Sequence, residues 1–372
     1  MQKLPRRSYR AVLTSALVIL AFLAMTLPGQ SAEAARWEIS EDAFVDFHYL
    51  LQGWAQLTTE GSDRRTVTGP TLSVRRSRIL LRGQITPTLG FMLGTGNDLR
   101  AGTFEIWDAL TWLNVDRALV IDTGLVMLPF LRHAQQFSVN LHTVEFMRTA
   151  FLYPRESTSY RRAPGVRARG LLLGDRVDYR IAATTGAPTE SSRPRLTGRV
   201  GLNFLDPEPG YILPGTYFGN EQVITLGGAY DFQPEVVMGD RSYYAFGGDL
   251  FWSVPTGTHR ITGQVAVVYY RGLNALDEED LPIVADRTGV GTIVDAGYAF
   301  GAVEPVISAE WFRPQSADRL QGQRLGARLG LNWWVMGPTL NLKIDGGFIK
   351  EPGQVIEDAS PVVTVQLQTR LP

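Results

Sequence analysis

Residues 72–85 read LSVRRSRILLRGQI, and they alternate between apolar and polar, mostly basic, side chains. In an extended strand, successive side chains point to opposite faces. One face then carries Ile79, Leu81, Gly83 and Ile85, and the other carries Arg76, Arg78, Leu80, Arg82 and Gln84. Two classes of protein fit such a strand. In a soluble β-sandwich the apolar face would pack into a core, whereas in an outer-membrane barrel it would meet lipid and the arginines would line an aqueous lumen.

The N-terminal region has the features of a secretory signal peptide. Four basic residues precede an apolar block over residues 11–27, and Ala32-Glu33-Ala34 fits a small-residue cleavage site. We therefore assign residues 1–34 to a cleaved signal peptide and the polar, acidic residues 35–46 to a periplasmic lead-in. Cleavage removes four basic residues and one acidic residue, so the net charge falls from −1 to about −4. This charge argues against a general nucleic-acid binder.

The remaining chain favours strands over helices. It has no second apolar run of the roughly 18 residues that a spanning helix needs, so a membrane-inserted form must use strands. The chain has no cysteine, which excludes disulfides and thiolate metal sites. Its 38 glycines and its aromatic content of 10% suit a β-rich chain with many turns. One barrel domain over residues 47–372 fits best.

Sixteen segments alternate as residues 72–85 do, each near the length that crosses a bilayer at a tilt. An even number of strands returns the C-terminus to the side on which the N-terminus begins. The expected strands cover residues 47–58, 72–86, 89–98, 105–114, 119–128, 165–173, 177–185, 195–205, 222–232, 243–254, 260–270, 289–300, 303–312, 324–336, 339–349 and 362–371.

The connections alternate between short and long, as periplasmic turns and external loops do in outer-membrane barrels. Residues 255–259 form a short turn and residues 271–288 a long loop, whereas residues 206–221 are too long for their place among the turns. The longest connection, residues 129–164, carries apolar side chains that would let it fold inward and narrow the pore. The sequence therefore predicts an all-β, transmembrane antiparallel barrel of about 16 strands with a long third loop in the lumen.

Arginine is the residue type that points most directly to function. Fixed positive charge in a narrow aqueous channel raises the local concentration of anions. The expected lumen-facing arginines are Arg76, Arg78, Arg82, Arg167, Arg169, Arg195, Arg199, Arg324 and Arg328, and those of the long loop are Arg132, Arg148, Arg155, Arg161 and Arg162. The alternative is that acids on the same faces, such as Asp178, Glu310 and Asp345, pair with these arginines and cancel their charge.

For catalysis the chain offers four histidines and no metalloprotease, serine-hydrolase or phosphate-loop motif. His133 and His142 lie in the long loop with Glu145 nearby, and these residue types would suit a metal or hydrolytic site. The alternative is a polar loop whose histidines have no catalytic role. We favour the alternative and expect no enzyme activity, no cofactor and no metal.

A series of short features recurs in a fixed order along the chain. They are the arginine-rich strand of residues 76–83, Asp108-Ala109, Gly124 with Pro129-Phe130, Arg167 to Gly170 with Tyr179 and Gly186, Gly330-Leu331-Asn332 and Gln366-Leu367-Gln368. In this order the chain resembles the phosphate-selective porin O and P family over nearly the whole mature sequence. The resemblance implies a sixteen-stranded barrel, a trimer of separate pores, an inward third loop and basic residues along the channel. The family's terminal aromatic residue and lysine-rich cluster are missing here, which leaves phosphate itself open.

The sequence thus predicts a bacterial outer-membrane porin that forms a water-filled channel for passive diffusion of small, anionic solutes. Its partners would be outer-membrane lipid, small hydrophilic solutes and further copies of the chain in a homotrimer. Two other classes remain open: an outer-membrane barrel enzyme and a secreted, soluble β-rich binding protein. Loss of activity on mutation of the loop histidines would identify the enzyme, and recovery without detergent would identify the soluble protein.

Overall fold

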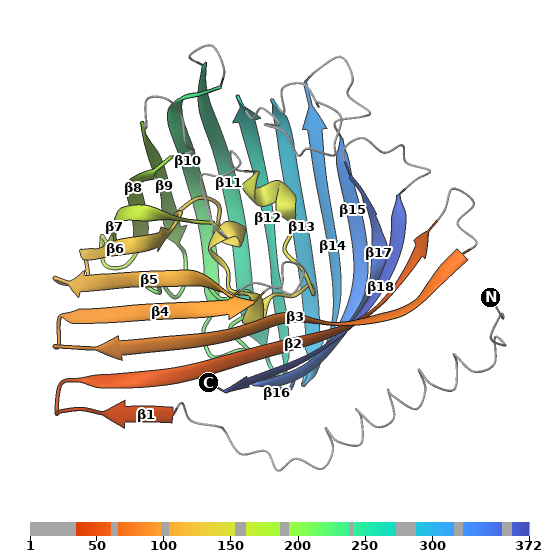
Figure 1. Ribbon diagram of the computed structural model, residues 1–372, viewed down its shortest axis with the longest axis horizontal. Coiled ribbons are helices and arrows are strands. Elements are labelled where there is room, and N and C mark those ends of the chain that lie inside the picture. Colours follow the sequence, from red (N-terminus) through yellow and green to blue (C-terminus); the bar gives the residue numbers. More distant parts are fainter. Residues whose placement is uncertain are drawn as a thin grey trace. The chain divides into compact units, whose positions relative to one another are not determined.

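The computed structural model describes residues 35–60, 66–97, 104–152, 161–186, 193–237, 241–272, 288–315, 323–351 and 359–371. The predicted signal peptide, residues 1–34, and Arg155 of the long loop lie outside these ranges. Within them, sixteen strands pair into a closed antiparallel barrel, as the alternating pattern predicts. Figure 1 shows β2 to β5 running across the view, whereas β11 to β15 run nearly upright.

The strand bounds follow the alternating segments closely. The barrel consists of β2 (Phe44–Glu60), β3 (Thr66–Gln84), β4 (Leu89–Asn97), β5 (Glu105–Asn114), β6 (Val120–Met127), β7 (Arg162–Leu172), β8 (Val177–Thr185), β9 (Pro194–Asn203), β10 (Val223–Val237), β11 (Arg241–Thr256), β12 (His259–Arg271), β13 (Gly289–Phe300), β14 (Val303–Pro314), β15 (Arg324–Trp333), β17 (Leu340–Lys350) and β18 (Ser360–Leu371). The segment expected as one strand over residues 324–336 is divided, because β16 (Val335–Pro338) is separate from β15.

The two ends of the described chain meet on one edge of β2. Each barrel strand pairs with the next, and β18 pairs back with β2, where Leu371 lies opposite Tyr49. The additional strand β1 (Ala35–Glu38) pairs with β2 directly beyond that point, with Ala35 opposite Phe47. Residues 35–46, which we expected to form a lead-in, therefore form β1, a turn and the start of β2, because their backbone completes the edge that β18 leaves unpaired.

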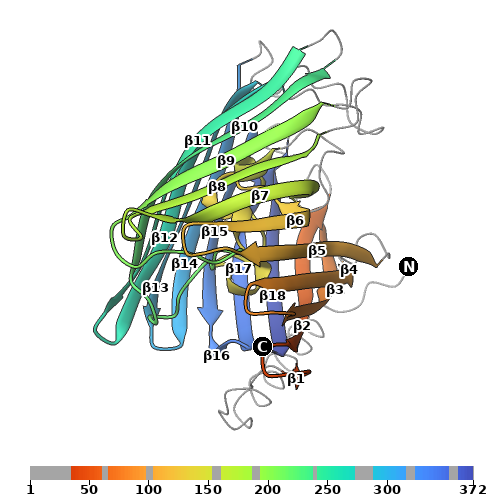
Figure 2. The same cartoon turned by 90° about the vertical axis from the view of Figure 1, so that its left-hand side faces the viewer.

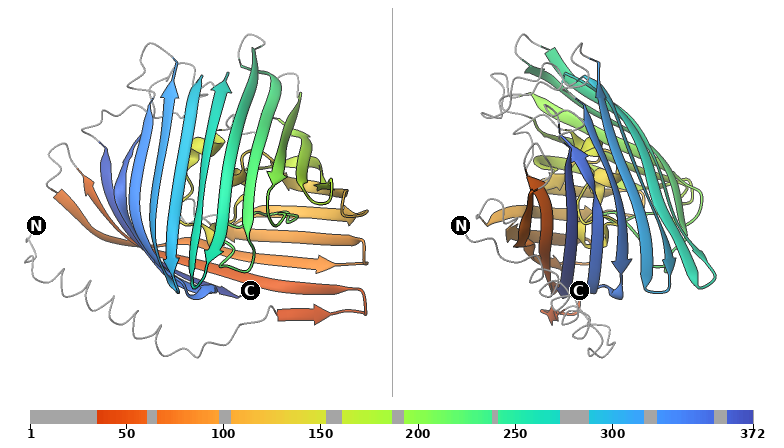
Figure 3. Two further views of the ribbon diagram at one scale, coloured as in Figure 1. Left: turned by 180° about the vertical axis from the view of Figure 1, so that it is seen from behind. Right: turned by 90° about the vertical axis from the view of Figure 1, so that its right-hand side faces the viewer.

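The side chains of the barrel are distributed inside out relative to a soluble protein. In β9, Leu196, Val200 and Leu202 are exposed on the outer face, whereas Arg195 and Arg199 are buried on the inner face. The same alternation of exposed apolar and buried polar side chains recurs in β8 and β14. Figures 2 and 3 show the walls that carry these faces from the sides and from behind. A closed barrel of this kind satisfies its backbone hydrogen bonds between strands and leaves no open edge.

Helices are short in the described part of the chain. Three 3₁₀ helices, η1 (Arg132–Gln135), η2 (Ser138–Asn140) and η3 (Arg148–Phe151), lie in the connection between β6 and β7. No helix among the described residues has the length and apolar character needed to cross a membrane. Short turns join the strands at one end of the barrel, and glycine at positive φ allows two of them, at Gly257 and Gly301.

Candidate functional site in the barrel lumen

The connection between β6 and β7 is called the long loop here, and its described residues, 128–152 and 161, lie inside the barrel (Figure 1). Its apolar side chains pack against inward-facing residues of five neighbouring strands, β10 to β14. The cluster contains Phe130, Leu131, Met147 and Ala150 of the loop and Ala229, Tyr243, Ala245, Ala266, Val268, Tyr270, Ile293 and Phe312 of the wall. The predicted inward fold of the long loop is therefore confirmed. Burial of apolar surface holds one side of the loop on the wall.

Polar contacts hold the η3 part of the long loop. The backbone N–H and the hydroxyl of Thr149 both donate to the Glu310 carboxylate, at 3.0 and 2.9 Å. The Tyr270 hydroxyl donates to the Thr149 carbonyl at 3.0 Å and accepts from the backbone N–H of Leu152 at 3.2 Å. Because these groups are buried, each would leave an unsatisfied partner if the loop moved away.

The tip of the long loop is held by hydrogen bonds to side chains of β13, β15 and β17. The His142 ring shares a hydrogen bond of 2.8 Å with Asp295, and the Asn332 side chain donates to the His142 carbonyl at 2.9 Å. Lys343 donates to the carbonyl of Leu141. Burial lowers the pKa of His142, but the carboxylates of Glu304 and Asp295 outweigh burial, so the pKa is raised overall.

The connection between β9 and β10, residues 204–222, also enters the lumen, and we call it the inward turn. It lies at the end of the barrel where the other connections are short turns. Leu213 and Thr216 are each only 1% exposed, and the Leu213 N–H donates to the carbonyl of Gln135 in the long loop at 3.1 Å. The Met127 N–H donates to the Tyr211 hydroxyl at 2.7 Å. The inward turn therefore contacts the long loop inside the lumen. The length of this connection did not by itself predict that contact.

Most of the predicted lumen arginines form ion pairs with carboxylates. The pairs are Arg76–Glu145, Arg132–Glu208, Arg162–Asp108, Arg167–Asp122, Arg169–Asp122, Arg195–Asp231, Arg199–Asp249, Arg324–Glu310, Arg324–Glu351 and Arg328–Asp345. The strand arginines among them lie on the inner faces, as the alternation predicts. Arg132 lies in the long loop as expected, whereas Arg162, also expected in the loop, is the first residue of β7, because it continues the pairing of β7 with β6 opposite Met127. The charge of the arginines is nevertheless largely balanced, which is the alternative that the sequence left open.

A β-bulge in β3 adds one arginine that the alternation misses. Gln52 lies opposite Arg76 while Gly53 lies opposite Val74, so Arg75 is the extra residue. As a result Arg75 and Arg76 both reach the Glu145 carboxylate, with Arg75 at 2.6 Å. Burial raises the pKa of Glu145, but the charges of Arg76 and Arg75 outweigh it and lower the pKa to about 2.

Three of the predicted arginines have no ion pair with a carboxylate among the described residues. Arg78 is 9% exposed, donates to the Ser138 hydroxyl at 3.0 Å and lies 3.5 Å from the centre of the Trp107 ring. Arg82 lies 5.6 Å from the centre of the Trp112 ring, and Arg148 is exposed within the lumen.

The last described arginine of the long loop, Arg161, holds the loop together. It donates to the carbonyl of Ala134 at 2.7 Å and to that of Gln136 at 3.3 Å, and its guanidinium faces the Phe146 ring at 4.0 Å. Its backbone has a φ of 69°, which a non-glycine residue seldom adopts. Arg161 therefore closes the loop on itself rather than lining free space.

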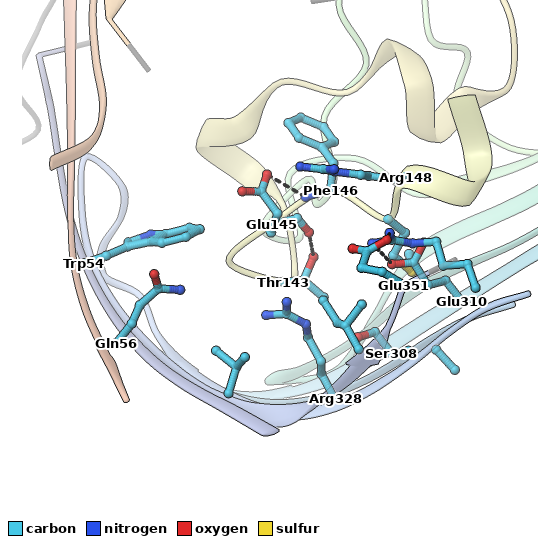
Figure 4. Close-up of a pocket in the computed structure, with 16 residues that line it drawn as sticks. Trp54, Gln56, Thr143, Glu145, Phe146, Arg148, Ser308, Glu310, Arg328 and Glu351 are labelled. Carbon is cyan, nitrogen blue, oxygen red and sulfur yellow. Dashed lines mark hydrogen bonds and ion pairs between the residues drawn. The ribbon is translucent and has the colours of Figure 1, made fainter. Parts of the chain in front are cut away.

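A cavity of about 190 Å³ remains between the long loop and the wall formed by β2, β14, β15, β17 and β18. Figure 4 shows Trp54 and Gln56 on one side of it, Arg328 and Ser308 below, and Thr143, Glu145, Phe146 and Arg148 of the loop facing them. A second space of about 10 Å³ shares Thr143, Ser308 and Arg328 and reaches His142 and Asp345. Little space is therefore left beside His142 at the loop tip, where polar side chains line it.

The residues weighed for catalysis each contact structural partners, and the two histidines are linked: Gln264 contacts His133 at 2.9 Å and donates to Asp295, the partner of His142, at 2.5 Å. The His133 ring accepts from the Met147 N–H at 3.0 Å, and burial lowers its pKa to about 4. His142 contacts Asp295, and Glu145 contacts Arg75 and Arg76. Among the described residues, no three side chains of metal-ligand type gather closely enough to hold a metal ion.

Comparison with known proteins gives a structural likeness alone. No protein-family model matches the sequence, and no curated protein matches it either. Among solved structures, the barrel is similar to outer-membrane porins. The anion-selective porin from Comamonas acidovorans aligns with a TM-score of 0.59 at 10% identity, over 88% of this chain and 100% of the porin. OmpF of Salmonella typhi in complex with daunomycin aligns with a TM-score of 0.58 at 15% identity, over 89% and 100%.

OmpT of Vibrio cholerae, an outer membrane protein solved in a trimer form, aligns with a TM-score of 0.56 at 11% identity, over 89% of this chain and 100% of OmpT. At such identities the likeness establishes the barrel fold. The finer resemblance to the phosphate-selective O and P family is therefore carried by the sequence features alone.

Proposed function

We propose that this protein is an outer-membrane porin through which small hydrophilic solutes diffuse passively. The observation that carries the proposal is the inside-out barrel with an inward loop: apolar side chains cover the outside, and charged ones surround a partly filled lumen. Lipid is the solvent that suits the outer face, and water suits the inner one. The similarity of the fold to outer-membrane porins supports the same function.

We further propose that the channel prefers anions. Near β3, Arg75 and Arg76 both pair with the carboxylate of Glu145, and Arg78 forms no ion pair with a carboxylate among the described residues. On β7, Arg167 and Arg169 likewise share Asp122. Positive charge therefore exceeds negative charge on this part of the wall, and a narrow lumen would concentrate anions there.

The excess does not extend around the whole lumen. Across the lumen, Glu310 of β14 and Glu351, which follows β17, both pair with Arg324 of β15. The preference should therefore be moderate. Inorganic anions of the phosphate type are candidate solutes, in line with the resemblance to the O and P family.

A bilayer recording of Arg78→Gln tests both parts of this proposal. Wild-type protein in a planar bilayer under a KCl gradient should give stepwise currents whose reversal potential indicates anion preference. We expect Arg78→Gln to lower the anion-to-cation permeability ratio by roughly half, because it removes a charge that forms no ion pair with a carboxylate among the described residues.

The control is Arg117→Gln, which removes the same charge from an exposed pair with Asp175. It should leave the ratio unchanged, because charges separated by more than the Debye length of about 8 Å at physiological salt are screened. A folded barrel that gives no current steps would refute the porin. A cation-selective wild type, or an Arg78→Gln channel equal to wild type, would refute the anion preference alone.

The localisation and the assembly of the protein follow from its proposed function as a porin. We propose that residues 1–34 direct export and are cleaved, and that the mature protein forms homotrimers in the outer membrane. OmpT, which shares the fold, has been solved as a trimer. Mass determination of the detergent-extracted protein, together with its N-terminal sequence, checks both statements.

A further inference from the structure

The inward turn and the long loop meet at one buried carboxylate. Glu208 of the inward turn is 3% exposed, and it accepts from the Nε atom of Arg132 in the long loop at 3.0 Å. It also accepts from the Tyr217 hydroxyl at 2.6 Å. Its backbone carbonyl accepts from the Arg180 guanidinium of β8 at 2.7 Å. One residue thus connects the barrel wall, the inward turn and the long loop.

Arg132 is correspondingly bound on several sides. Its guanidinium lies 3.2 Å from the centre of the Phe251 ring and donates to the carbonyl of Pro214 at 2.7 Å. Its backbone N–H donates to the Asp249 carboxylate of β11 at 3.0 Å. Because Arg132 is the first residue of η1, these contacts fix the point at which the long loop turns into the lumen.

The Arg132–Glu208 pair is shielded from water, which makes its loss costly. Burial raises the pKa of Glu208, but the charge of Arg132 and the hydrogen bonds from Arg132 and Tyr217 outweigh it, so the pKa is lowered overall. Glu208 is therefore ionised at neutral pH. Removing one partner of a buried pair leaves the other charge uncompensated, which is much less favourable than breaking an exposed pair.

We propose that Glu208 is a positioning residue that sets the width of the channel through Arg132. With the charge of Glu208 gone, the η1 end of the long loop loses its ion pair with the inward turn and keeps the weaker hydrogen bonds of Arg132 to Pro214 and Asp249. The other attachments, at Thr149 and His142, remain, so the loop shifts without leaving the lumen. This inference rests on the proposed porin function for its first test and on geometry alone for its second.

The first test compares Glu208→Gln with wild type in planar bilayers. We expect roughly twofold greater single-channel conductance and more frequent current fluctuations, because a less constrained loop widens and varies the narrowest part of the pore. Tyr217→Phe, which removes one hydrogen bond to Glu208, should change both quantities in the same direction and by less.

The matched control is Asp231→Asn. Asp231 pairs with Arg195 between the neighbouring strands β9 and β10, and both residues are fully buried. Like Glu208→Gln, this variant removes one negative charge from the interior, so both should shift the reversal potential in the same direction. Only Glu208→Gln should raise the conductance and the fluctuations, because of these two carboxylates only Glu208 forms an ion pair with the long loop.

The second test does not depend on conduction. The chain has no cysteine, and Gln136 of the long loop and Leu213 of the inward turn are neighbours in a parallel β-bridge. The double variant Gln136→Cys with Leu213→Cys should form an intramolecular disulfide readily in folded, detergent-solubilised protein. Adding Glu208→Gln should slow this reaction several-fold, whereas adding Asp231→Asn should not.

The combined outcomes separate the two proposals. If the wild type does not conduct but Glu208→Gln slows the cross-link, the porin function fails and the positioning role stands. If the wild type conducts and Glu208→Gln changes neither conductance nor cross-linking, the positioning role is overturned. Unfolding of Glu208→Gln would be detected as loss of heat-shifted gel mobility, and Tyr217→Phe would then decide the question in both assays.

Discussion

His142 lies at the tip of the long loop, where charged groups from three strands face it. Asp295 of β13 is 2.8 Å from its Nδ1 atom, Glu304 of β14 is 3.8 Å from its Nε2 atom, and Lys343 of β17 is close enough to oppose their effect. The two carboxylates attract the protonated ring, so the ring holds the loop tip to the wall most strongly when it is charged.

This arrangement predicts a channel that loosens as the pH rises. Because the pKa of His142 is raised overall, its attraction to the wall is fully present below the unfolded value of about 6.5 and is lost as the pH rises through the folded value. We expect single-channel conductance to increase above neutral pH in recordings from about pH 5 to pH 9.

The comparison that checks this assignment is His142→Gln, which should give a conductance that no longer depends on pH over that range. His259→Gln serves as its control, because His259 stacks on Tyr298 outside the loop and should retain the pH dependence. A pH step that survives in His142→Gln would assign it to another group.

At the scale of the elements, the alternation of connection lengths predicts which end of the barrel faces the cell exterior. The short turn between β11 and β12 should be periplasmic, and the connection after β12, residues 271–288, should be external. An epitope inserted at Asp277 should bind antibody on intact cells, whereas one inserted at Thr256 should require permeabilised cells. The reverse pattern would show that the barrel is inserted with the opposite polarity.

The strands could be read from the sequence because their signal is local. Alternation within β5, β8 and β13 gave the bounds that the structure shows, and the apolar content of the long loop gave its inward fold. The β-bulge at Arg75 could not be predicted from the sequence. A bulge changes which face of the sheet a side chain points to, but it leaves the order of the residues unchanged.

The candidate site was less predictable than the fold, because it depends on which strands lie side by side. Asp122 neutralises Arg167 from 45 positions away, and only the register of β6 against β7 brings them together. Asp231 and Arg195 are likewise joined by the register of β9 and β10. The inward turn was detectable only as an anomaly of length, since no pattern in residues 204–222 indicates that Glu208 meets Arg132.

For the molecule as a whole, the inside-out distribution predicts how the protein behaves in solution. Exposed residues such as Ile106, Phe246 and Leu329 form an outer surface that needs lipid or detergent, and the backbone is satisfied by pairing around a closed ring. We expect the protein to require detergent for extraction and to migrate differently on a denaturing gel before and after boiling. Recovery in the soluble fraction without such a shift would contradict the membrane barrel.

The strands β18 and β1 lie end to end along the same edge of β2. Leu371 and Ala35 follow one another along the same edge, opposite Tyr49 and Phe47, so the chain nearly completes a circle in space as well as in hydrogen bonding. A circular permutant can join Leu371 to Ala35 by a short linker and open the chain at the turn after Gly257. Such a permutant keeps every strand pair of the barrel, so the strands can be synthesised in a different order without changing the pairing.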